Sequence, residues 1–317
     1  MYEDILKYFP KEISEKITKY LENDTQLLEE IRLRNNRPII LKFSRSEKEL
    51  NVIVKTQDIL ETLQYICDNS IYSYQSQICE GYITIKGGHR IGITGNTIIE
   101  KNKVINIKYI SGLNFRIARQ ILGVSKDFLK YILDLENNSI YNTLIISPPG
   151  SGKTTLLRDL VRNISNGIPE INYKGKSISV VDERGEIAAM YKGVPQNDVG
   201  IRTDIIDNCP KSIGMKIMIR SMSPEIIVAD EIGKKEDIEA INYATCCGIK
   251  GIFTAHGSCI QDLRLNPIIT DLLNKNIIEK LIFLNKREKG KVDRIYKLNK
   301  ERKDYEIEQG GKQNANI

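Results

Sequence analysis

The sequence predicts an α/β protein, in which a mostly parallel, doubly wound sheet follows a smaller α+β region. From about Asn142 onward, short apolar segments alternate with longer helical ones, as in parallel sheets with helices on both faces. Before that point, alternating strands, glycine turns and short amphipathic helices are mixed without this rhythm. We therefore expect an N-terminal α+β domain over residues 1–120, a second domain over 121–300 and a polar, disordered tail over 301–317.

Periodicity and turn residues justify the elements of the first region. Ile13, Ile17 and Leu21 recur at four-residue spacing, which predicts an amphipathic helix. Residues 29–43 alternate around a turn at Asn35 and Asn36 and predict a two-stranded hairpin. The remaining expected elements are a helix over 56–68, a strand, Gly-Gly turn and strand over 81–99, and further strand over 105–120.

The second region predicts strands that end in polar residues and are followed by helices. The expected strands cover 143–147, 177–181, 225–229 and 250–255, the expected helices 153–165, 210–222 and 235–248, and a terminal hairpin 280–298.

Composition suits a soluble globular protein. The 317 residues are 41% hydrophobic and 28% charged, and the net charge of +6 is compatible with a nucleic acid or an anionic membrane without requiring either. No apolar run approaches the roughly 18 residues of a spanning helix, and the first residues lack the order of a signal peptide. The six cysteines form no C-x-x-C pair. We expect reduced cysteines and a cytoplasmic protein, at most docked on a membrane from that side.

The segment "SPPGSGKTT" predicts a phosphate-binding loop between a strand and a helix. Backbone N–H groups at Gly150 and Gly152 can curl around a phosphate chain, and the N-terminus of the following helix adds partial positive charge. Lys153 would reach the β- and γ-phosphates, and the hydroxyl of Thr154 would bind Mg²⁺. The expected nucleotide-binding residues are Ser147, Pro148, Pro149, Gly150, Ser151, Gly152, Lys153, Thr154 and Thr155.

Ser147 occupies the place where the pattern G-x-x-x-x-G-K-[ST] has its first glycine. That position shapes the turn out of the strand. At negative φ a serine fits without strain, whereas at positive φ it costs about 1–2 kcal/mol. Because Pro148 and Pro149 also fix two φ angles, we expect the loop to bind nucleotide.

Two apolar strands end in acidic pairs, "VVDERGE" and "IIVADEIG". A phosphate loop needs one carboxylate near Mg²⁺ and a second to position the attacking water. Asp230 fits the metal role and Glu231 the role of general base. Asp182 and Glu183 form a second pair that can serve the metal and the chemistry in the same way, because neighbouring parallel strands end at one edge. The alternative for either pair is a helix cap or a surface ion pair.

His256 follows another apolar strand, where an imidazole could donate to the γ-phosphate and report its presence. The alternative is a structural or merely exposed histidine. For the base, we favour ATP over GTP, because Glu288 replaces the aspartate of the N-K-x-D pattern that reads guanine.

These motifs resemble the secretion-type ATPases of type II and type IV secretion and pilus machines. The loop "PPGSGKTT", the acidic segment "VVDERGE", the segment "IRSMSPEIIVADE" and the histidine segment "TAHG" match their patterns, apart from Ser147 and from Asp230, where those enzymes often have glycine. The segments "EEIRLRNNRPIIL", "GYITIKGGHRIGITG" and "FRIAR" are similar to the stage III sporulation protein AA family of endospore-forming bacteria. The resemblance spans about Glu29 to Leu298.

The resemblance implies a RecA-like ATPase with ATP and Mg²⁺ as ligands. It implies a ring homo-oligomer, a hexamer by analogy, that lies in the mother-cell cytoplasm and docks on membrane proteins. Its implied role is to energise a channel or secretion complex between mother cell and forespore.

In the ATPases that this chain resembles, the N-terminal domain offers arginines to the nucleotide. The resemblance therefore also implies that N-terminal arginines complete a nucleotide site here. Among Arg32, Arg34, Arg37, Arg90, Arg116 and Arg119, we select Arg90 and Arg116 as residues that act on a neighbour's nucleotide. For any single arginine, the alternative is a solvated face or a structural ion pair.

Two other functions remain open at this point. A nucleic-acid-translocating ATPase would require a basic stripe interleaved with aromatics, but Lys and Arg are scattered and Trp is absent, so nucleic acid is the less favoured partner. A slow ATP-dependent regulatory switch would show low turnover that does not depend on protein concentration. The transported substrate, the direction of force and the docking surface do not follow from the sequence.

Overall fold

The computed structural model describes residues 2–22, 27–286, 288 and 290–310. The chain folds into two compact units. The N-terminal unit comprises Met1–Arg119 together with Ala189–Gln196, and the phosphate-loop unit comprises Gln120–Ala188 with Asn197–Ile317. The stretch Ala189–Gln196, here called the inserted segment, was not anticipated from the sequence.

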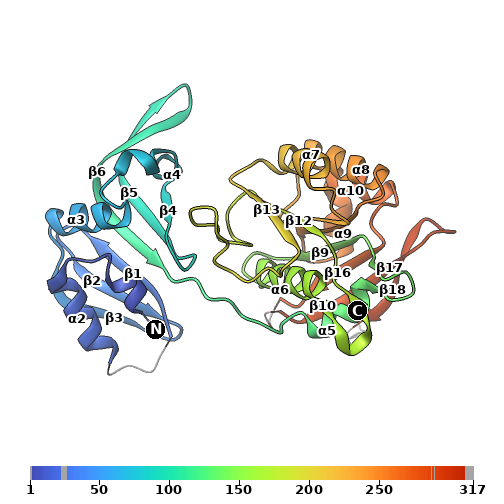
Figure 1. The fold of residues 1–317 in the computed structure, drawn as a ribbon, viewed down its shortest axis with the longest axis horizontal. Helices are drawn as coiled ribbons and strands as arrows, with labels where there is room; N and C mark the ends of the chain where they lie inside the picture. The colour runs from blue at the N-terminus through green and yellow to red at the C-terminus, as the bar shows by residue number, and fades with distance from the viewer. Residues whose placement is uncertain (1, 23–26, 287, 289, 311–317) are drawn as a thin grey trace. The chain divides into compact units, whose positions relative to one another are not determined.

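The N-terminal unit is built on a six-stranded sheet in the order β3-β2-β1-β6-β5-β4, with every neighbouring pair antiparallel (Figure 1). Its strands are β1 (Leu28–Arg34), β2 (Pro38–Phe43), β3 (Glu47–Ile53), β4 (Tyr82–Thr84), β5 (Arg90–Glu100) and β6 (Lys103–Arg116). Its helices are α1 (Glu3–Leu6), α2 (Lys11–Leu21), α3 (Thr56–Ile66), η1 (Ile71–Tyr74) and α4 (Gln75–Cys79). The two helices, the hairpin and the strands predicted for this region are confirmed, whereas β3 and the short helices α1, η1 and α4 were not predicted.

The two faces of this sheet differ in character. On β1, Ile31 and Leu33 are fully buried and pack with residues of the helices in one apolar core. Because side chains alternate along a strand, Arg32 and Arg34 lie on the opposite face. The register places Arg34 beside Gly112 and Arg32 beside Asn114 of β6.

The inserted segment is held within the N-terminal unit by polar contacts and by a small bridge of its own. The backbone N–H of Gly87 donates to Gln196 Oε1 at 2.7 Å, and Lys192 Nζ lies 2.6 Å from Asp68 Oδ2. Tyr191 and Val194 pair within the segment. Gly88 has a φ of 75°, and a Cβ there would lie 2.9 Å from the Cβ of Ala189, so glycine permits this close approach.

The phosphate-loop unit contains an eight-stranded sheet in the order β13-β12-β14-β15-β9-β16-β17-β18. Strands β13 to β16 in this order are parallel, and β17 and β18 are added antiparallel. The strands are β9 (Thr143–Ser147), β12 (Ile178–Asp182), β13 (Thr203–Asp207), β14 (Ile226–Ala229), β15 (Lys250–His256), β16 (Lys280–Leu284), β17 (Val292–Asn299) and β18 (Asp304–Gly310). Short pairs are β7 (Leu133–Asp134) with β8 (Ser139–Ile140), and β10 (Gly167–Ile168) with β11 (Tyr173–Lys174).

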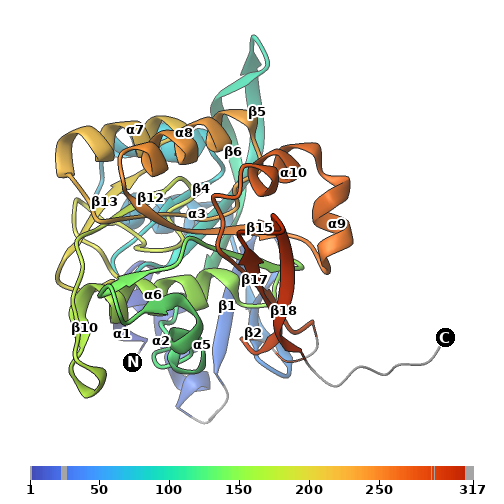
Figure 2. The ribbon, with the colours of Figure 1, turned by 90° about the vertical axis from the view of Figure 1, so that its right-hand side faces the viewer.

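Helices cover both faces of this sheet, so the predicted doubly wound, mostly parallel architecture is confirmed. They are α5 (Lys126–Ile132), α6 (Lys153–Asn166), η2 (Pro169–Ile171), α7 (Lys211–Met222), α8 (Lys235–Cys246), α9 (Ile260–Leu265) and α10 (Pro267–Asn274). Figure 2 shows α7 and α8 on one side of the strands and α6 on the other. The central strands are buried throughout their length, as expected when both faces are covered. Within the described residues, no helix is long and apolar enough to cross a membrane.

The expectation of a disordered tail over 301–317 is wrong for its first part. Residues Asp304–Gly310 form β18, which pairs with β17. Tyr305 donates its hydroxyl to the carbonyl of Ile278 at 2.8 Å, and Lys280 lies 2.6 Å from the carboxylate of Glu308. Polar composition concealed a strand whose polar side chains have specific partners. Residues 311–317 lie outside the described part.

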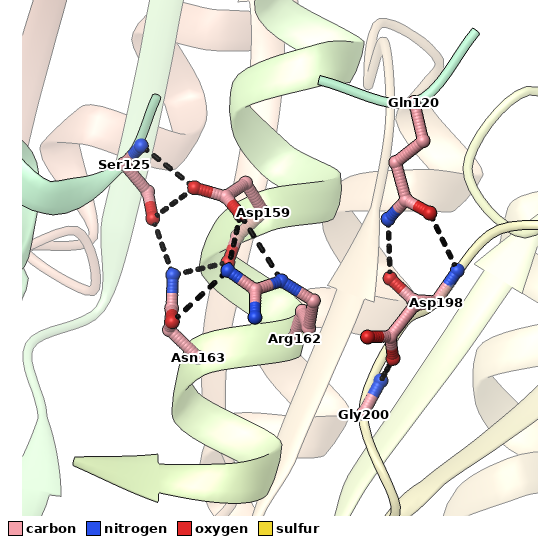
Figure 3. Close-up of polar contacts among 7 residues, drawn as sticks. All are labelled: Gln120, Ser125, Asp159, Arg162, Asn163, Asp198 and Gly200. Atoms are coloured by element: carbon pink, nitrogen blue, oxygen red, sulfur yellow. Dashed lines mark hydrogen bonds and ion pairs between the residues drawn. The ribbon is translucent and has the colours of Figure 1, made fainter. Parts of the chain in front are cut away.

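The first residues of the phosphate-loop unit are tied to its central helix (Figure 3). Asp159 of α6 accepts from the backbone N–H of Ser125 at 2.8 Å and from its hydroxyl at 2.7 Å. Arg162 also donates to Asp159 at 2.8 Å. Gln120 exchanges two hydrogen bonds with the backbone of Asp198, at 2.7 and 2.9 Å. The segment that enters this unit is therefore fixed to the helix that begins at the phosphate loop.

Candidate nucleotide site

The phosphate loop connects the buried strand β9 to helix α6, as the sequence predicts. Gly150 and Gly152 have φ values of 76° and 91°, which side-chain-bearing residues rarely adopt. A Cβ at Gly150 would meet nothing within 4 Å, so the loop is open at this point. Pro148, Pro149 and Ser151 complete the loop, and Thr155 follows in the first turn of α6. Backbone N–H groups and a helix N-terminus here form an anion-binding arrangement.

Ser147 is the last residue of β9 and is 1% exposed. It is not among the residues with positive φ, so the serine causes no left-handed strain. Its hydroxyl donates to the carbonyl of Pro148 at 3.0 Å. The sequence allowed a serine here without strain if φ is negative. That condition is met, so Ser147 is compatible with the loop.

Lys153 begins α6 and is 5% exposed. Its Nζ donates to the carbonyl of Ser147 at 3.1 Å and lies 3.1 Å from His256 Nδ1. Burial lowers the pKa of the Lys153 ammonium below its ordinary value, and the carboxylates of Asp230 and Glu231 oppose this shift. The ammonium is held beside the loop by weak acceptors that a phosphate can replace.

Thr154 and Asp230 meet where a metal ion is expected. Thr154 Oγ1 donates to Asp230 Oδ2 at 2.6 Å, and Thr254 of the neighbouring strand donates to Asp230 Oδ1. The Thr254 oxygen also accepts the backbone N–H of Glu231 at 2.8 Å. This fully buried threonine therefore positions both acidic residues at the end of β14.

Glu231 is shared between a histidine and an arginine. His256 Nε2 lies 3.1 Å from Glu231 Oε1, and Arg184 forms an ion pair with the other oxygen. The backbone φ of Glu231 is 53°, a strained conformation of the kind that gathers at functional sites. His256, placed at a strand end by the sequence, thus joins Glu231 to Lys153.

Asp182 organises the loop that follows β12. Its carboxylate is 2% exposed and accepts the backbone N–H groups of Glu186, Ile187 and Ala188 at 2.8 to 3.0 Å. These bonds give Asp182 a structural task that the sequence reasoning did not foresee beside its expected metal role.

Glu183 is paired with a lysine at the start of α7. Lys211, 7% exposed, forms an ion pair with Glu183, and Lys234 Nζ lies 3.9 Å away. Burial raises the pKa of the Glu183 carboxyl, but the lysines outweigh this and hold it below its ordinary value. Both acidic pairs line one small pocket with Arg184 and Lys211.

The oxygen atoms near the loop are suited to a Mg²⁺ ion that is also bound by the phosphates of a nucleotide. The hydroxyl of Thr154 and the carboxylate of Asp230 are oxygen donors, which this cation prefers. In the described part of the chain, no group of three or more His, Cys, Asp or Glu side chains could hold a metal alone. Mg²⁺ commonly uses one or two protein oxygens together with substrate phosphates and water, so the residues fit such a site.

Arg90 and Arg116 lie in the N-terminal unit. The register places them side by side on β5 and β6, with Glu30 of β1 next to Arg116 on the other side. The Arg90 guanidinium lies 4.6 Å from the centre of the Tyr82 ring, whereas Arg116 is exposed. Within the described residues, no ion pair of Arg116 is found. Of the two, Arg116 is the better placed to reach another molecule.

Sequence reasoning missed four residues of the site region. Thr254, Arg184 and Lys211 contact the acidic residues from neighbouring segments. Arg158 of α6 donates to the carbonyls of Glu186 and Ile187 at 2.6 and 2.8 Å. Thr254 and Arg184 stand inside the motifs "FTAHG" and "VVDERGE", so their place beside the selected residues was an available signal.

Solved structures similar to this chain include an ATPase and a pilus retraction motor. The Legionella pneumophila ATPase DotB has a TM-score of 0.60 at 14% identity, covering 93% of this chain and 83% of that one. The pilus retraction motor PilT, solved with bound ADP, has a TM-score of 0.55 at 16% identity, covering 84% and 76%. At these identities the likeness shows that this chain shares their fold.

Sequence comparisons are more specific. The family model described as sporulation stage III, protein AA, matches residues 2–303. Stage III sporulation protein AA of Bacillus subtilis (strain 168) is 38% identical over 294 residues, which cover 92% of this chain and 94% of that protein. The uncharacterized protein ycf45 of Porphyra purpurea is 29% identical over 169 residues, 52% of this chain and 27% of that protein. By its sequence and its fold, the chain belongs to the family of stage III sporulation protein AA.

Proposed function

We propose that the chain is a Mg²⁺-dependent ATPase. The observation that carries the proposal is the line of contacts from the phosphate loop to the acidic strand end, formed by Lys153, His256 and Glu231. The Thr154–Asp230 hydrogen bond lies at the same strand ends. This set combines a phosphate-binding loop, a metal site and a carboxylate base, the parts that phosphoryl transfer to water requires.

The residues divide the work as follows. Lys153 and the backbone N–H groups from Gly150 to Thr155 bind the phosphates, while Ser147, Pro148 and Pro149 shape the loop. Thr154 with Asp230 would hold Mg²⁺, which would neutralise developing charge. Glu231 accepts a proton as a water oxygen bonds to the γ-phosphorus and the bond to the β-phosphate oxygen breaks, giving ADP and phosphate. His256 contacts the terminal phosphate. Asp182 shapes the adjoining loop, and Glu183 is the alternative base.

The energy of this reaction drives a motor in the proposal. DotB is described as an ATPase and PilT as a pilus retraction motor, and this chain shares their fold. We infer a ring homo-oligomer, a hexamer, in which Arg116 or Arg90 completes a neighbour's site. Its place is the mother-cell cytoplasm at the membrane, where it energises a channel complex towards the forespore by docking on membrane proteins. Family membership supports the sporulation context.

The test measures phosphate release and nucleotide binding by the purified full chain. Lys153→Ala is expected to abolish or severely weaken ATP binding, because it removes the buried charge beside the loop. Glu231→Gln is expected to bind ATP and lose hydrolysis. Glu225→Gln is the matched control, since Glu225 precedes the opposite end of the same strand and pairs with Lys176 at 2.7 Å. Its turnover should equal that of the wild type.

Two outcomes would change the proposal. Normal turnover in Glu231→Gln with loss in Glu183→Gln would transfer the role of base to Glu183. Native mass measurement with and without ATP tests the ring. A monomer under both conditions, with slow turnover independent of protein concentration, would favour a regulatory switch over a motor.

A further inference from the structure

We propose that Arg184 is a γ-phosphate-binding residue that acts in its own subunit, and that its ion pair with Glu231 is its position before nucleotide binds. The inference rests on the proposed function, because it assigns a second catalytic group to the same site. It differs from the arginine supplied by a neighbour, since Arg184 belongs to the phosphate-loop unit itself.

The backbone that carries Arg184 is fixed by buried groups. Asp182, immediately before the loop, accepts three backbone N–H groups of residues 186–188. Arg158 donates to two carbonyls of the same loop from α6, the helix that begins at Lys153. The loop is therefore attached to the phosphate-binding helix, and a side chain anchored on it is pre-organised relative to the phosphates.

The side chain of Arg184, by contrast, is largely open to solvent. It is 63% exposed, whereas its partner Glu231 is 22% exposed. An ion pair whose arginine is open to solvent is weak, so a stronger anion can readily take the guanidinium. Arginine binds phosphate through paired N–H donors, which makes a terminal phosphate such an anion.

The contacts lead from Arg184 to the phosphate loop without a break. Arg184 pairs with Glu231, Glu231 lies 3.1 Å from His256, and His256 lies 3.1 Å from Lys153. Lys153 is the residue that faces the β- and γ-phosphates in such loops. A γ-phosphate beside Lys153 is thus within the same cluster of side chains as Arg184.

The exchange of partners has a chemical consequence. The Glu231 oxygen that Arg184 holds is not available to a water molecule. When Arg184 moves to phosphate, Glu231 retains His256 and becomes free to accept the proton of the attacking water. The same movement places positive charge where the transferring phosphoryl group gains negative charge. Other arginines of this region are already committed: Arg158 to carbonyls and Arg162 to Asp159.

The decisive measurement is binding of ADP and of a non-hydrolysable ATP analogue, each with Mg²⁺, to the full chain. Arg184→Ala should lower the affinity for the ATP analogue by roughly tenfold to hundredfold, as expected when hydrogen bonds to a charged group are lost. Its ADP affinity should change less than about twofold, because ADP has no γ-phosphate. Arg264→Ala is the matched control, since Arg264 is 59% exposed and pairs with Asp304 at 3.0 Å. It should leave both affinities unchanged.

Turnover supplies the second readout. Arg184→Ala should lower kcat by roughly 10²-fold, and Arg184→Lys should recover part of it through charge alone. In mixtures with Glu231→Gln protein, Arg184→Ala should gain no activity, because each arginine serves its own subunit. Recovery in such mixtures would overturn the assignment in favour of a neighbour's site.

The assignment of Arg184 to the γ-phosphate would also be overturned if Arg184→Ala lost ADP and analogue affinity equally, or lost neither. Arg184 would then be only a restraint on Glu231. The binding comparison separates this inference from the proposed function. Selective loss of the analogue in a protein without turnover would support Arg184 while refuting ATP hydrolysis, and a wild type that binds neither nucleotide would refute both.

Discussion

The two sheets of this molecule present their polar residues in opposite ways. In the phosphate-loop unit, parallel strands bring Ser147, Asp182, Asp230 and His256 to one edge, because the carboxyl ends of all these strands point the same way. In the N-terminal unit, antiparallel strands spread arginines over one face, where Arg116 lies between Glu30 and Arg90. The parallel edge can assemble reacting groups, whereas the antiparallel face offers a surface to another molecule.

The largest effect is expected from Arg116→Ala, which tests whether the antiparallel face takes part in the reaction. If the antiparallel face completes a neighbour's site, kcat should fall by roughly 10³-fold or more, as for other arginines supplied in trans. Mixing this variant with Glu231→Gln should restore part of the hydrolysis, since some sites receive Arg116 from the base-deficient neighbour. Arg90→Ala is tested in the same way.

The control for that prediction is Arg45→Ala, an exposed arginine in the turn between β2 and β3. It should retain wild-type turnover. Mixed rings that demonstrably co-assemble and still release no phosphate would confine all the chemistry to the parallel edge.

A second prediction concerns the buried anchor on α6. Asp159→Asn should lower the free energy of unfolding by about 3 kcal/mol, because the change removes a buried charge from Arg162 and Ser125. Urea unfolding measures the effect. Asp271→Asn, in an exposed pair with Lys275, should cost less than about 1 kcal/mol. An equal loss in both variants would show that Asp159 is no special anchor.

The pH dependence of that difference has a defined sign. Burial opposes ionisation of Asp159, but hydrogen bonds from Ser125 and Arg162 outweigh it and lower its pKa below the ordinary value of 3.8. The carboxylate therefore stabilises the fold fully above that ordinary value, and the contribution is lost as pH falls through the lower folded pKa. The gap between wild type and Asp159→Asn should narrow on acidification in this range and stay constant near neutrality.

A third prediction sharpens the role of the parallel edge. Thr254→Val keeps the side-chain shape but removes the hydroxyl that holds Asp230 and the Glu231 backbone. A lost buried partner of this kind costs about 1–3 kcal/mol, so kcat should fall roughly tenfold to hundredfold, with a higher Mg²⁺ requirement. Thr254→Ser should restore most of the activity. Thr245→Val, which removes a hydroxyl bonded within α8, should have no effect on turnover.

The smallest expected effect belongs to Ser147→Gly. Because Ser147 lies in strand geometry without positive φ, glycine relieves no strain there, and ATP affinity should change by less than about tenfold. Equilibrium binding measures it. A large gain would reveal a hidden cost of the serine, and a large loss would show that its hydroxyl contacts the nucleotide.

The parallel unit was the more predictable of the two, for a physical reason. A strand end followed by Asp-Glu, a glycine loop or His carries its meaning within a few residues, so Lys153, Asp230 and His256 could be selected directly. The roles of Thr254 and Arg184 were not predicted, because each contacts an acidic residue that follows a different strand. Such pairing depends on strand order and register, which local periodicity does not specify.

The structure of two segments was not predicted, for other reasons. The polar composition of residues 304–310 favours solvent, yet these residues pair with β17, and Tyr305 and Glu308 have side-chain partners. The inserted segment has no periodicity that would assign it to a distant part of the chain. For the inserted segment, contacts far apart in sequence override the local signal, whereas for residues 304–310 a neighbouring strand does so.

The inserted segment determines how the units can be separated. The chain passes between the two units three times, after Arg119, after Ala188 and after Gln196. Exchange of units between neighbouring copies would require more than the opening of one linker, because Gln196 and Lys192 must also leave Gly87 and Asp68. A fragment that ends at residue 119 therefore lacks the inserted segment and with it part of its own fold.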